Sequence, residues 1–102
     1  MTPSVREPAV APVIRVRLPG LVDAYTGGKR EVELPVAGSP TVADALEALD
    51  ARFPGLRFRL IDEQGAIRPH VKLFVDASLV RDLGATMRSG SELMIVGALS
   101  GG

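Results

Sequence analysis

The sequence lacks cysteine, has a single histidine, and carries aromatic side chains at only 4% of its 102 positions. Without cysteine there are no disulfides, no thiolate metal ligands and no cysteine nucleophile. The one histidine, His70, has no second histidine or cysteine with which to build a zinc site, so we interpret it as a loop or strand-edge residue and expect no metal centre. So few aromatic rings also offer no platform on which nucleic-acid bases could stack.

Net charge and long apolar runs are lacking as well. The chain has 12 basic and 12 acidic residues, so its formal charge is zero and a polyanion is not attracted in bulk. No apolar run approaches the roughly 18 to 20 residues that cross a bilayer, and the first dozen residues lack the apolar centre of a signal peptide. We therefore expect a cytoplasmic protein with neither nucleic acid nor membrane as a partner.

The length of the chain suits one small domain. Residues 1–12 contain three prolines and no hydrophobic period, which predicts a disordered N-terminal arm. We predict the folded domain at residues 13–96 and a flexible C-terminal tail at residues 97–102.

Two segments in the first half alternate between apolar and polar residues, as strands buried on one side do. They cover residues 13–18 and 31–36, and a loop through residues 24–28 separates them. We expect the two strands to pair as a hairpin.

A helix follows, and its start is the clearest local signal in the chain. Thr41 stands at the N-cap position with Asp44 three residues later, which is a shortened capping box. Pro54 and Gly55 end the helix. The apolar residues recur at helical spacing and predict one buried stripe, formed by Val42, Ala45, Leu46, Leu49 and Phe53.

The second half predicts an irregular crossover at residues 56–69, a strand at 71–75, a short edge strand at 78–81 and a last strand at 92–96. This order of elements predicts an α+β fold of the ubiquitin-like β-grasp kind. A mixed sheet of four to five strands would pack on one main helix, with the last strand central and parallel to the first. A ferredoxin-like sandwich is the alternative, but residues 56–65 are too short and too poor in period to form its second helix.

The last strand predicts an exposed apolar surface. If Leu93 and Ile95 face the helix, Met94 and Val96 lie on the open face, with Phe74 nearby. An open sheet face usually carries polar residues, and methionine suits adaptable contacts. We predict that Phe74, Met94 and Val96 dock a partner; ordinary half-buried packing is the alternative.

Four arginines also cluster in sequence around the helix end and the crossover. We interpret them as a solvated basic patch, with an acidic partner face or RNA as the alternative. They are Arg52, Arg57, Arg59 and Arg68.

The chain ends in two glycines, Gly101 and Gly102. They remove every Cβ near the terminal carboxylate, so that the end can enter a narrow channel. Taken alone, such an end is more typical of an ordinary frayed terminus than of a functional tail.

Taken together, these features resemble the ThiS/MoaD family of bacterial sulfur carriers, which share the β-grasp and end in Gly-Gly. The resemblance rests on the opening strand, residues 41–46, residues 89–92 and the terminal glycines. Within the family, residues 26–28 and the crossover ending at residues 68–70 are most similar to the subgroup typified by the carrier CysO, which feeds sulfur to a cysteine synthase. Residues 98–100 depart from the usual Val-Ala before the glycines, which leaves the receiving enzyme open.

The resemblance implies that the chain is a carrier and not an enzyme. An ATP-dependent adenylating enzyme of the ubiquitin-activation type would adenylate the Gly102 carboxylate, and sulfur would replace AMP to give a thiocarboxylate. A sulfur-accepting synthase of the PLP-dependent kind would then take the sulfur for cysteine or a related metabolite. No cofactor would be bound by the chain, and ATP would be used by its partner. We expect a monomer when the protein is free.

In this interpretation Gly102 is the modified residue, and the residues before it thread into the partner, where Leu99 fills a pocket. The threading residues are Gly97, Ala98, Leu99, Ser100 and Gly101.

Three other functions stay open at this point. Within the same chemistry, the chain could be the small subunit of molybdopterin synthase. As a ubiquitin-like modifier it would join Gly102 to lysines, and as a plain β-grasp binding module it would have an inert tail.

Overall fold

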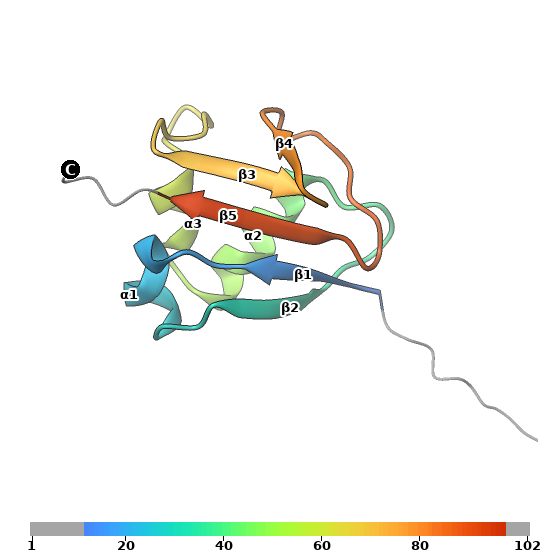
Figure 1. Cartoon of the computed structure of the whole chain (residues 1–102), viewed down its shortest axis with the longest axis horizontal. Helices are drawn as coiled ribbons and strands as arrows, with labels where there is room; N and C mark the ends of the chain where they lie inside the picture. Colours follow the sequence, from blue (N-terminus) through green and yellow to red (C-terminus); the bar gives the residue numbers. More distant parts are fainter. Residues whose placement is uncertain (1–11, 98–102) are drawn as a thin grey trace, which may run out of the picture.

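The computed structural model describes residues 12–97, which fold into one sheet with helices packed against it (Figure 1). The elements occur in the predicted order, with three additional short helical segments. The strands are β1 (Val13–Arg17), β2 (Glu31–Pro35), β3 (Val71–Val75), β4 (Ser78–Val80) and β5 (Glu92–Gly97); the helices are η2 (Gly20–Val22), α1 (Asp23–Thr26), α2 (Val42–Arg52) and α3 (Leu56–Leu60).

The sheet has five strands in the order β2-β1-β5-β3-β4. Strands β1 and β5 run parallel, with Val16 opposite Leu93, whereas the other neighbouring strands are antiparallel. The last strand is thus central and parallel to the first. The predicted α+β class and β-grasp topology are confirmed.

Helix α2 covers one face of this sheet and begins at the predicted capping box. The Asp44 N–H donates to Thr41 Oγ1 at 3.1 Å, and the Thr41 N–H donates to Asp44 Oδ2 at 2.9 Å. The predicted stripe is buried along its whole length, so this helix joins the sheet in one core. Its buried members are Val42, Ala45, Leu46, Leu49 and, just after the helix, Phe53.

The first connection is more regular than predicted. The segment expected to be a loop contains the single turns η2 and α1. Gly27 ends α1 in a left-handed conformation with φ of 68°, and its N–H donates to the Asp23 carbonyl at 3.0 Å. Elements of three and four residues are too short to show a hydrophobic period, so the pattern could not reveal them.

The prediction of an irregular crossover at residues 56–69 is also wrong, because the crossover contains α3. The side chain of Asp50, on α2, caps the start of this helix. Its Oδ1 accepts the N–H groups of Gly55 and Arg57 at 3.1 and 3.0 Å. Leu56 and Leu60, four positions apart, are fully buried. That spacing was visible in the sequence, but two residues do not establish a period.

Replacing Thr41 by alanine is expected to lower the free energy of unfolding by about 1 kcal/mol, because it leaves the N–H of Asp44 without its acceptor. For a domain of this size, thermal unfolding should then begin about 4–8 °C lower. Thr41→Ser is the control, since serine keeps the hydroxyl. Equal losses in both variants, measured by circular dichroism, would contradict the capping role.

Candidate functional site

The open face of the sheet carries a row of apolar side chains. Phe74 on β3 lies opposite Met94 on β5 and opposite Leu79 on β4. Residues directly opposite one another project from the same face. Leu79 and Val96 are 43% and 41% exposed, while Phe74 and Met94 are half-buried. We call these four residues the sheet-face patch.

The structure brings together the three residues predicted to dock a partner, Phe74, Met94 and Val96. Their sequence neighbours Leu93 and Ile95 are buried on the helix side, as the alternation indicated. The docking role itself stays a prediction.

Leu79 is the member of the patch that sequence reasoning missed. Its strand has three residues, and alternation cannot establish a register over so short a run. The register is set by the turn before it, where Asp76 and Ala77 have positive φ of 48° and 74° and place Ser78 opposite Val75. Such turns favour Asn-Gly or Asp-Gly, so Asp-Ala gave only a weak signal.

Beside the patch, a hollow of about 460 Å³ extends to the end of β5. Arginines at its border are held by neighbouring carboxylates. Arg17 pairs with Glu92 at 3.4 Å, and Arg30 makes a two-pronged ion pair with Asp23. The hydrogen bond that Arg30 donates to Asp23, and then the charge of that carboxylate, raise the pKa of Arg30. The hollow is lined by Arg17, Leu18, Pro19, Arg30, Met94, Ile95, Val96 and Gly97.

Gly97 is the last described residue, and it belongs to the sheet. The sequence placed it in the tail, but it ends β5 and lies opposite Val71. A Cβ built on Gly97 would lie 2.6 Å from Leu21 Cδ2 and 3.2 Å from Leu21 Cβ. A side chain at this position would therefore require Leu21, on the η2 turn, to shift.

The predicted reactive residue Gly102 and the predicted arm Ala98, Leu99, Ser100 and Gly101 lie outside the described residues. Their roles stay predictions. The described part ends beside the hollow and next to the sheet-face patch, which is where those residues begin.

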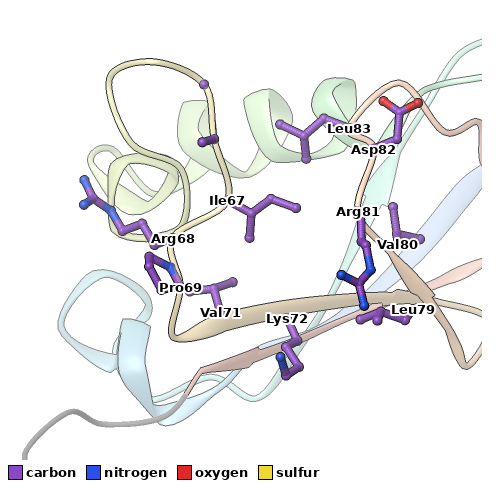
Figure 2. A pocket seen from close by; sticks show the side chains of 12 residues that line it. Ile67, Arg68, Pro69, Val71, Lys72, Leu79, Val80, Arg81, Asp82 and Leu83 are labelled. Carbon is purple, nitrogen blue, oxygen red and sulfur yellow. The ribbon is translucent and has the colours of Figure 1, made fainter.

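A second depression, of about 580 Å³, lies on the side of β3 that faces away from β5 (Figure 2). One wall is the crossover and the other is the segment that follows β4. We call it the edge groove. It is lined by residues 65–69, Val71, Lys72 and residues 79–83.

The four arginines that the sequence grouped together do not form one uniform solvated patch. Arg52 donates to the Glu33 carbonyl at 3.2 Å, and Arg68 donates to the Phe58 carbonyl at 2.8 Å. The Arg68 guanidinium also lies 4.5 Å from the centre of the Phe58 ring. At least these two arginines stabilise local structure.

Two further findings concern residues 12–97 alone. No group of three metal-binding side chains occurs in this range, and none of its helices is long and apolar enough to cross a membrane.

Known proteins with similar sequences and structures indicate the family to which this fold and surface belong. The sequence profile of the ThiS family matches residues 16–102. Small archaeal modifier protein 1 of Haloferax volcanii is 33% identical over 79 residues, which cover 78% of this chain and 90% of that protein.

Solved structures of proteins with related names have a similar fold. A chain in the crystal structure of the Amycolatopsis orientalis BexX/CysO complex is similar with a TM-score of 0.75 and 28% identity, over 87% of this chain and 99% of that one. Mycobacterium tuberculosis CysO, described as an antigen, is similar with a TM-score of 0.72 and 25% identity, over 84% and 99%.

Gly97→Ala is expected to destabilise the fold by about 1–3 kcal/mol, because the new methyl group overlaps Leu21, whose buried side chain must shift. Gly20→Ala, in the same turn, is the matched control: its Cβ would meet only ordinary contacts at 3.7 and 3.8 Å, and we expect a change within about 0.5 kcal/mol. Chemical denaturation measures both. Equal stability of the two variants would show that the contact is not tight.

Proposed function

Because the chain belongs to the ThiS family, we propose that it is a sulfur carrier whose reactive group is the C-terminal carboxylate of Gly102. The observation that carries this proposal is that the family match continues through residue 102 and so includes both terminal glycines. The described end of β5, beside an apolar patch, gives this tail a rigid base.

The proposed chemistry starts with activation, because a carboxylate is a poor acylating agent whose leaving group would be oxide. The Gly102 carboxylate attacks the α-phosphate of ATP on an adenylating enzyme of the ubiquitin-activation type, and pyrophosphate leaves. A sulfur nucleophile at the oxidation level of hydrosulfide then attacks the acyl carbon, and AMP leaves. The product is a terminal thiocarboxylate, which is anionic at neutral pH and nucleophilic.

In this scheme the chain is a co-substrate and catalyses no step. ATP is used by the partner, and the chain binds no cofactor of its own. We assign the described residues two tasks, which are to hold β5 rigid through the core and to present the sheet-face patch to the partner.

The patch is suited to the adenylating enzyme. A docking surface next to the base of the tail would place the carboxylate in the partner's active site without a long search by a free chain end. Apolar side chains ringed by charged ones are typical of partner-binding surfaces, and here Arg17 and Glu92 stand at the border. That a similar chain occurs in a BexX/CysO complex supports partner binding by this fold.

For the acceptor we propose a sulfur-accepting synthase, of the PLP-dependent kind, that makes cysteine or a related metabolite. The resemblance of the crossover to the CysO subgroup supports this choice, as does the similarity to structures named for CysO. These reactions would take place in the cytoplasm.

A second candidate is protein modification, favoured by the relative named small archaeal modifier protein 1. The same acyl-adenylate chemistry serves both functions, since a lysine amine can accept the acyl group in place of sulfur. Gly-Gly remnants on lysines of other proteins would then be found by peptide mass spectrometry.

Incubation of the full chain with its adenylating enzyme, ATP and a sulfur donor should replace one terminal oxygen by sulfur, seen as an intact-mass increase located at Gly102. Deleting Gly101 and Gly102 should abolish this conversion while the melting temperature stays nearly unchanged, because the glycines contribute almost nothing to the core. An unmodified carboxylate, under conditions in which a related carrier is converted, would contradict the proposal.

Val96→Glu should lower kcat/KM for adenylation at least roughly tenfold, because it places a charge in the proposed apolar contact. Phe58→Glu is the matched control, since Phe58 is 55% exposed but lies on α3, outside the patch. Pyrophosphate release measures both rates. Equal effects of the two variants would show that adenylation does not depend on the patch.

A further inference from the structure

The edge groove exists because β4 is short. Only Leu73–Val75 of β3 pair with β4, and after Val80 the chain turns away toward α2, where the Leu83 carbonyl accepts the Ala43 N–H at 2.9 Å. On the side away from β5, the first residues of β3 have no strand neighbour within residues 12–97. The groove therefore lies along an open stretch of sheet edge.

The inner walls of the groove are apolar. Ile67 on the crossover and Leu83 beyond β4 point toward one another across the space (Figure 2). Val71, at the start of β3, is buried at its base, and Leu79 stands 43% exposed at its outer end. A volume of about 580 Å³ is within the range of ligand-binding pockets in proteins.

The rim of the groove is cationic. Arg68 and Lys72 point outward from it, and the Arg81 side chain extends from the β4 side toward β3 (Figure 2). The only acid in the lining is Asp82, whose Oδ1 accepts the Gly84 N–H at 2.8 Å. Positive charge thus gathers here although the whole chain is formally neutral.

These cations differ from the arginines elsewhere on the sheet. In the described part of the chain, the arginines of β1 and the loop before β2 are each paired with a carboxylate: Arg15 with Glu31, Arg17 with Glu92 and Arg30 with Asp23. The three cations of the groove have no such partner among the same residues. Lys72 and Arg81 are therefore available to carboxylates from outside, whereas Arg68 already donates to the Phe58 carbonyl and stacks on the Phe58 ring.

We propose that the edge groove binds an extended, acidic segment of a partner protein, with apolar side chains alternating with carboxylates. The first residues of β3 have no strand neighbour on this side within residues 12–97, but the Val71 N–H already donates to the Arg68 carbonyl at 2.9 Å, so the segment would be held mainly by its side chains. The apolar walls would receive its apolar side chains, and Lys72 and Arg81 its carboxylates. The proposal does not depend on sulfur transfer.

RNA fits the groove less well, because no aromatic ring lines it for a base to stack on. The exposed ring of Phe58, on α3, does not line the groove, and the Arg68 guanidinium stacks on it.

The test is a titration of the ¹⁵N-labelled full chain with a heptapeptide of alternating glutamate and leucine, capped at both ends. Saturable amide shifts are expected for residues 67–72 and 79–83, and the affinity should fall as salt is added. The same peptide with lysine in place of glutamate should not bind. Absence of shifts in the groove at millimolar peptide, or shifts confined to Met94 and Val96, would overturn the proposal.

Charge-reversal variants provide the matched control. The double variant Lys72→Glu/Arg81→Glu should weaken binding of the glutamate peptide roughly tenfold. Lys29→Glu/Arg88→Glu changes the net charge equally but alters residues that do not line the groove, and it should bind as the parent does. Equal weakening of peptide binding in both double variants would show that binding depends on net charge alone, and it would overturn the proposed site. Stronger shifts of the same amides by oligouridylate than by the peptide would also overturn the acidic-segment assignment.

Discussion

The parallel pairing of β1 and β5 in the centre of the sheet is the constraint on which the rest of the structure depends. Because the two strands run in the same direction, the end of β5 lies at the same end of the sheet as the end of β1. The η2 turn that follows β1 therefore meets Gly97, and it does so closely enough to exclude a Cβ. The hollow, the last described residue and the border arginines all lie at this corner for the same reason.

The sheet separates two requirements by its two faces. Leu93 and Ile95 pack under α2 and stabilise the fold, while Met94 and Val96, which alternate with them, lie on the open face where we propose that a partner docks. Because adjacent residues of one strand perform the two tasks, a substitution on the open face can change binding without removing core contacts. The proposed carrier function would use this open face, since each proposed partner would have to recognise the folded domain before it could use the tail.

The two candidate surfaces differ in chemistry although they share the edge formed by β3 and β4. The sheet-face patch is apolar, and nearby arginines are neutralised by Glu92 and Asp23. The edge groove combines apolar walls with cations that have no carboxylate partner in the described part of the chain. A formal charge of zero therefore conceals an uneven distribution, which composition alone could not show. The two surfaces meet at Leu79, which belongs to both, and at Lys72, which lies opposite Val96.

Much of the fold was predictable because its signals are local. Thr41 and Asp44 mark the start of α2 within four residues, and the alternation of residues 92–96 separates the buried from the open face. The three docking candidates followed from that alternation. Leu79 did not, because the side to which a three-residue strand points depends on its pairing with β3. The short helices η2, α1 and α3 also escaped, since they are held by capping contacts and burial and show no period.

By itself, then, the sequence determined the order of the main elements, the stripe of α2 and the family resemblance, because each depends on residues close together in the chain. Only the tertiary structure decided why Gly97 is glycine, which residues complete the patch and where positive charge stays unpaired. These properties arise between segments far apart in sequence, such as Leu21 with Gly97 or the crossover with the residues after β4. A one-dimensional pattern carries no information about such distances until the sheet has brought the segments together.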